Sequence, residues 1–82
     1  MNLTLSGEQL QELRKTYRYL RVGRDEVDGR PILQATKAVQ LRGRRASELI
    51  KWDTIPVLEP SERDRTVVQI YPNRIWDIEE LL

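Results

Sequence analysis

Residues 31–52, with the sequence PILQATKAVQLRGRRASELIKW, contain the pattern that decides the predicted fold. Pro31 suits the first position of a helix, because an amide hydrogen is not needed there. Ile32, Ala35 and Val39 then recur at helical spacing and mark one apolar face. A short helix is therefore predicted to begin at Pro31.

A second helix is predicted over residues 42–52, after a tight turn. Its inward residues are expected to be Ala46, Leu49 and Ile50. Because successive residues are rotated by about 100°, the opposite face is polar and mostly basic. The residues of this outward face are Arg44, Ser47, Glu48 and Lys51. The two helices together predict a helix-turn-helix over residues 31–52.

Branched residues dominate the sequence that follows, which is typical of strands. They form two runs, Ile55–Leu58 and Thr66–Tyr71, with charged residues 59–65 between them. A two-stranded hairpin, or wing, is therefore predicted over residues 55–71. Apolar residues then recur at helical spacing, so a closing helix is predicted over residues 74–82.

The N-terminal stretch predicts a further helix over residues 6–22. Ser6 and Gln9 form a capping-box pattern at its start. The apolar residues that then repeat at helical spacing are Leu10, Leu13, Tyr17 and Leu20. This stripe either packs in the core of its own domain or docks on a neighbouring copy or a partner protein. The polar residues 23–30 predict a mobile loop.

This order of elements predicts an α+β fold, a small winged helix-turn-helix with an extra N-terminal helix, as one domain over residues 1–82. Residues 32–82 also resemble the MerR-like excisionase family of small DNA-binding domains. The residues that carry the resemblance are Ala35, Val39, Leu41, Ala46, Leu49, Ile50, Lys51, Ile55 and Pro56, followed by residues 67–71 and 77–81. The resemblance implies a recognition helix that ends in Leu-Ile-Lys, a wing strand that opens with Ile-Pro, and a function in DNA binding.

The composition of the 82-residue chain argues against several functions. It has no cysteine and no histidine, which removes thiolate and imidazole ligands and the usual nucleophile–base pairs. Its acidic residues lack the spacing of a calcium loop. No apolar run approaches the roughly 18 to 20 residues of a membrane helix. We therefore expect a cytoplasmic protein that is not an enzyme and needs no metal or cofactor.

Basic residues are unevenly distributed, although the formal net charge is only +1. Residues 10–24 hold five basic residues and one acid, and residues 30–51 hold six basic residues and one acid. Residues 53–82 hold seven acids against three arginines. The distribution predicts one anion-binding face. Three arginines of the predicted N-terminal helix either extend this face or pair with acids: Arg14, Arg18 and Arg21.

Double-stranded DNA is the predicted partner, contacted by three groups of residues. The residues expected to read base edges are Arg44, Ser47, Glu48 and Lys51. Arg42 and Arg45 are expected to contact phosphates near the start of the recognition helix. Arg63 and Arg65 at the wing tip are expected to straddle a phosphate or to enter a minor groove.

Two classes of function remain open at this point. The first is sequence-specific DNA binding, by an excisionase-like accessory factor of recombination or by a small transcriptional regulator of phage or plasmid type. Further copies on adjacent sites are expected to add affinity, because one such module has a small DNA interface. The second is a protein-binding adaptor that docks its N-terminal helix on a recombinase or polymerase.

Overall fold

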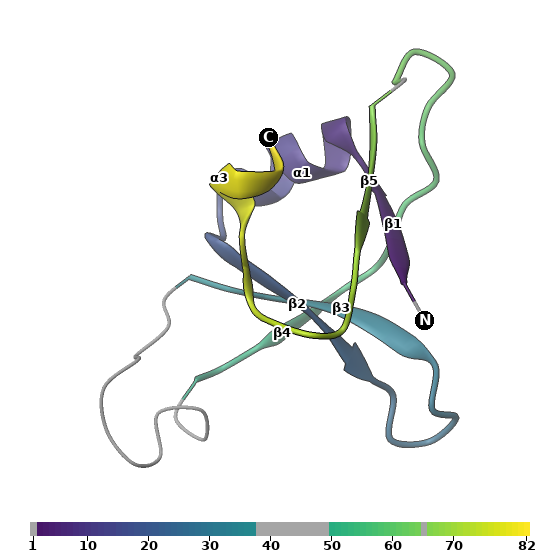
Figure 1. The fold of residues 1–82 in the computed structure, drawn as a ribbon, viewed down its shortest axis with the longest axis vertical. Coiled ribbons are helices and arrows are strands. Elements are labelled where there is room, and N and C mark those ends of the chain that lie inside the picture. Colours follow the sequence, from purple (N-terminus) through teal and green to yellow (C-terminus); the bar gives the residue numbers. More distant parts are fainter. Residues whose placement is uncertain (1, 38–49, 65) are drawn as a thin grey trace.

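A four-stranded antiparallel sheet forms the base of the molecule, and helices and a separate ribbon lie on one side of it (Figure 1). The computed structural model describes residues 2–37, 50–64 and 66–82. The sheet has the strand order β4-β3-β2-β6, and the ribbon pairs β1 with β5. The strands are β1 (Leu3–Ser6), β2 (Tyr19–Arg24), β3 (Pro31–Thr36), β4 (Asp53–Ile55), β5 (Val67–Ile70) and β6 (Trp76–Asp77). The helices are α1 (Gly7–Arg14) and α3 (Ile78–Leu81).

The core lies between the inner face of the sheet and the elements that cover it. The sheet, the ribbon and both described helices contribute to it, so the chain is a small, compact α+β domain. The buried apolar side chains are Leu5, Leu10, Leu13, Leu20, Leu33, Ala35, Ile70 and Ile78. Trp76 is partly buried and packs against this cluster.

The N-terminal helix is much shorter than the predicted range of 6–22. Ser6 is its N-cap, and its hydroxyl oxygen accepts a hydrogen bond from the Gln9 amide over 3.1 Å, as the capping pattern predicts. The helix ends at Arg14, and residues 19–24 form β2 instead. Leu20 is buried and Arg21 only partly so, which is the alternation of a strand. Short apolar runs fit both spacings, and the pairing of β2 with β3 and β6 decides in favour of the strand.

Residues 31–36 form β3, so the prediction of a helix that begins at Pro31 is wrong. Leu33 and Ala35 are buried, whereas Ile32 and Gln34 beside them are only partly buried. Pro31 is the first residue of the strand, a position where its missing amide hydrogen is tolerated. Pairing with β2 on one side and β4 on the other outweighs the weak helical spacing.

The predicted second helix and the predicted wing also change. Most of the helix expected over residues 42–52 lies outside the described residues, but residues 50–52 are not helical. The hairpin expected over residues 55–71 is not formed, because β4 pairs with β3 and β5 pairs with β1. The sequence at 3–6 supplies a strand partner that the hairpin prediction did not include.

The closing helix begins later than the predicted residue 74. Residues 76 and 77 pair with β2, and α3 follows with Asp77 as its N-cap. The loop predicted over residues 23–30 begins later, because Gly23 and Arg24 belong to β2. In the remaining β2–β3 connection the Asp25 carboxylate accepts a 2.8 Å hydrogen bond from the Val27 amide. Gly29, with φ of 73°, completes that turn. None of the helices in the described part of the chain is long and apolar enough to cross a membrane.

Candidate nucleic-acid interface

The outer face of the sheet is not covered by any described element, because α1, α3 and the β1–β5 ribbon all pack on the inner face (Figure 1). Side chains alternate between the two faces of a strand. Since Leu20 and Val22 pack toward the core, Arg21 of β2 belongs to the outer face. Its cross-strand partner there is Gln34 of β3. The outer face is therefore a polar surface formed by side chains of neighbouring strands.

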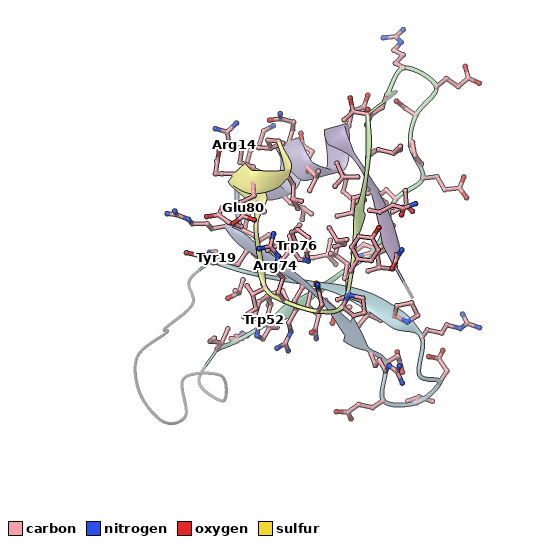
Figure 2. The ribbon with its side chains drawn as sticks, viewed as in Figure 1. Arg14, Tyr19, Trp52, Arg74, Trp76 and Glu80 are labelled. Atoms are coloured by element: carbon pink, nitrogen blue, oxygen red, sulfur yellow. The ribbon has the colours of Figure 1, made fainter. Side chains whose placement is uncertain are left out.

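Arg21, Gln34 and Trp52 form a cluster on this face. The Arg21 Nε donates a 2.7 Å hydrogen bond to Gln34 Oε1, and the guanidinium lies 4.2 Å from the centre of a Trp52 ring. Figure 2 shows Trp52 on the side of the sheet away from α1. Such a stack contributes about 0.5 to 2 kcal/mol, depending on how far the cation is removed from water. We name these three residues the Arg21 cluster.

Partial burial lowers the pKa of Arg21 from its ordinary value. An arginine nevertheless keeps its proton near neutral pH, so the cluster is a fixed positive charge. The Trp52 Nε1 is buried and has no hydrogen-bond partner among the described residues. A buried donor left unpaired costs about 1 to 3 kcal/mol, which an acceptor at this point would recover.

Gly23 allows the Gln34 side chain to lie across the outer face. A Cβ atom at position 23 would stand 2.5 Å from Gln34 Oε1 and 2.9 Å from its Cδ, which is closer than these atoms tolerate. A side chain at this position would displace the Gln34 amide and remove its bond to Arg21. The cluster therefore depends on a glycine in the middle of the sheet.

A basic segment joins β3 to β4 at one end of this face. Ala35 pairs with Asp53, so the chain leaves and re-enters the sheet at the same end. Lys37 and Lys51 flank the segment, and both are exposed. The predicted site residues between them lie outside the described residues, and so does one at the predicted wing tip: Arg42, Arg44, Arg45, Ser47, Glu48 and Arg65.

Arg63 is not brought together with Lys51. It is exposed in the connection between β4 and β5, and this connection reaches the end of the longest molecular axis away from the start of β4 (Figure 1). Because no hairpin forms there, the predicted pair of arginines on a wing is not built. The structure thus separates the two predicted contact residues that it describes, Lys51 and Arg63.

The N-terminal arginines do not form the continuous basic face that one helix would give. The Arg14 Nε lies 2.8 Å from Glu79 Oε1, and the Arg18 Nε lies 3.5 Å from Asp77 Oδ2. Acids of the C-terminal region therefore compensate two of the three arginines. Arg21 is the exception, because its described partners are an amide and an indole ring.

Sequence reasoning missed the Arg21 cluster. Its members come from β2, β3 and the residue before β4, and no spacing along the chain links them. The available signal was the alternation Tyr19-Leu-Arg-Val22, in which a strand puts the basic residue opposite the apolar ones.

No protein-family model matches this chain, and no curated protein or solved structure matches it significantly. Among the residues that the structure describes, no group of three acidic, histidine or cysteine side chains is placed to hold a metal ion. The chemistry of the outer face is that of a cationic and aromatic surface.

Proposed function

We propose that this chain is a DNA-binding protein, in which the outer face of the sheet and the basic β3–β4 segment form one interface. The Arg21 cluster is the observation that supports the proposal most directly. Its guanidinium offers a fixed charge for a phosphate, and its indole and amide offer stacking and hydrogen bonds to bases. Strands are an established means of entering a DNA groove.

The basic segment supplies the electrostatic part of the proposal. Arg42, Arg44 and Arg45 lie between the two exposed lysines that flank it. Each phosphate that such a residue neutralises releases counterions and lowers the free energy of binding. The recognition helix predicted over residues 42–52 remains a prediction, and the proposal does not depend on it.

The proposed biological role is that of an accessory factor of recombination or a small transcriptional regulator, acting in the cytoplasm without catalysis. The role is suggested by the resemblance of the sequence to MerR-like excisionases. The described residues do not form that family's wing, residues 50–52 are not helical, and Ala35 lies in a strand. Further copies on adjacent sites belong to the same proposal.

The alternative, a protein-binding adaptor, requires the apolar stripe of the N-terminal helix to be available to a partner. Three of the four residues of the proposed docking stripe, Leu10, Leu13 and Leu20, are buried in the core of the chain itself. Leu10 and Leu20 could contact a partner only if the domain unfolded, so the stripe as a whole is not a docking surface and DNA binding is the better supported function.

DNA binding is tested by titrating a labelled duplex of mixed sequence with the full chain, read by fluorescence anisotropy. We expect affinity to fall by about tenfold or more between about 50 mM and about 200 mM salt. Arg44→Ala with Arg45→Ala should reduce the slope of log affinity against log salt by about two. Gly23→Ala should weaken binding severalfold while leaving the thermal midpoint nearly unchanged.

The matched control for the arginine pair is Lys15→Ala with Arg30→Ala, which removes the same charge elsewhere on the surface. We expect this control to retain most of the slope. Salt-insensitive binding, no binding at all, or equal slopes for the two double variants would contradict the proposal.

A further inference from the structure

A groove of about 320 Å³ runs along α1, which packs on the face of the sheet opposite the Arg21 cluster. One wall is α1 and the other is the segment that follows β4. Leu13 and Ile55 form part of its apolar lining, and Leu58, with 59% of its surface exposed, stands on the second wall. A volume near 300 Å³ is at the small end of ligand sites, so there is room for a few side chains.

The two walls are held together by the buried side chain of Gln9. Its Nε2 donates a 2.8 Å hydrogen bond to the Pro56 carbonyl, and its Oε1 accepts a 3.2 Å hydrogen bond from the Leu58 amide. Tyr17 at the other end donates a 2.8 Å hydrogen bond to Asp53 Oδ2. The groove is therefore formed before any ligand binds, which lowers the entropic cost of binding.

The rim of the groove is acidic. Glu8 and Glu12 of α1 face Glu59 on the opposite wall, and no lining residue is basic. The Glu8 carboxylate accepts a hydrogen bond from the Ser61 hydroxyl, which leaves its charge in place. Glu12 pairs with Lys15 over 3.0 Å, but both side chains are more than two-thirds exposed, so this pair is weak.

The spacing of the carboxylates matches an extended chain. Glu8 and Glu12 are one helical turn apart, a rise of about 6 Å. Alternate residues of an extended peptide are about 6.6 Å apart and point to the same side. Basic residues at alternate positions would therefore meet both carboxylates while the apolar residue between them enters the groove.

We infer that the groove binds an extended segment of a partner protein in which apolar residues alternate with lysine or arginine. The apolar side chain packs against Leu13, Ile55 and Leu58, and its basic neighbours pair with the acidic rim. This surface is separate from the proposed DNA interface, so the chain would hold DNA on one side and a protein on the other.

The probe is a labelled Lys-Leu-Lys-Leu-Lys peptide, compared with Glu-Leu-Glu-Leu-Glu, and both are titrated into the full chain. We expect only the lysine peptide to bind, with shifts in the amide NMR signals of Gln9 and Leu58. Glu59→Gln should weaken binding by about two- to fivefold, in the range of an exposed charge pair. Leu58→Ala should weaken it further, because an exposed apolar wall is removed.

Each groove variant has a matched control. Glu26→Gln removes one exposed carboxylate from the β2–β3 connection, and Val57→Ala shortens an exposed side chain next to Leu58 that does not line the groove. We expect both controls to bind as the unmodified chain does. Equal binding of the two peptides, or groove variants indistinguishable from their controls, would overturn the inference. So would a self-association that Leu58→Ala abolishes, because a second copy would then occupy the groove.

Discussion

At the scale of single residues, the Asp64 side chain links the segment before β5 to the start of α1. Its Oδ2 accepts a 2.8 Å hydrogen bond from the Glu8 amide, and its Oδ1 accepts a 3.0 Å hydrogen bond from the Thr66 amide. The bond from Glu8 is the largest cause that lowers the pKa of Asp64, with further contributions from Thr66 and the Ser6 hydroxyl, partly opposed by desolvation. The carboxylate thus satisfies a free amide in the first turn of α1.

We predict that Asp64→Asn lowers the stability of the domain at neutral pH and weakens its dependence on acid. The folded-state pKa lies below the ordinary aspartate value of about 3.9, so the carboxylate stabilises the fold above that pH. This contribution is lost as the pH falls through the lowered folded-state pKa. Urea unfolding of both proteins at pH values from neutral to strongly acidic measures the difference. Parallel stability curves would show that Asp64 does not contribute in this way.

At the scale of elements, the decisive feature is which strand pairs with which. The predicted hairpin paired residues 55–58 with the strand that is now β5, but β1 pairs with β5 in their place. In this pairing Thr4 lies opposite Gln69. Both side chains are exposed, and the chain has no cysteine of its own. The pairing can therefore be tested by introducing two cysteines, because no native cysteine would compete for the disulfide.

We predict that Thr4→Cys with Gln69→Cys forms an intramolecular disulfide on mild oxidation. Because the bond closes a long loop, it should stabilise the domain by about 2 to 4 kcal/mol relative to its reduced form. Non-reducing electrophoresis and unfolding with and without reductant measure both effects. The single variants, which have no intramolecular partner, serve as controls. A double variant that stays reduced or forms only dimers would contradict the β1–β5 register.

At the scale of the whole molecule, the proposed DNA interface occupies one end of a body 44 Å long. Lys51 stands just before β4, and Arg63 belongs to the β4–β5 connection, which reaches the end of the long axis away from the start of β4 (Figure 1). We predict that Lys51→Ala weakens duplex binding severalfold, whereas Arg63→Ala leaves the Kd within about twofold, since a charge beyond the Debye length is screened. The anisotropy titration at moderate salt compares them. Equal losses would mean that the duplex runs along the long axis and contacts both ends.

The start of the first helix and part of the core could be predicted from the sequence. The Ser6 cap and its bond to the Gln9 amide follow from local side-chain chemistry, and the burial of Leu10, Leu13 and Leu20 follows from their apolar character. The cap does not depend on distant parts of the chain, whereas burial is completed by residues from the other strands and from α3. For Leu20 the prediction left burial and partner docking open, and the structure buries this residue in β2 and not in a helix.

Only the tertiary structure decided between helix and strand at residues 19–24 and 31–36, and which strands pair. Short apolar runs fit either spacing, and the hydrogen bonds that choose between them join residues far apart in sequence. The same holds for the Arg21 cluster, where Arg21, Gln34 and Trp52 meet because three segments lie side by side. A capping pattern is a contact within one turn of chain, whereas this surface exists only after the sheet has assembled.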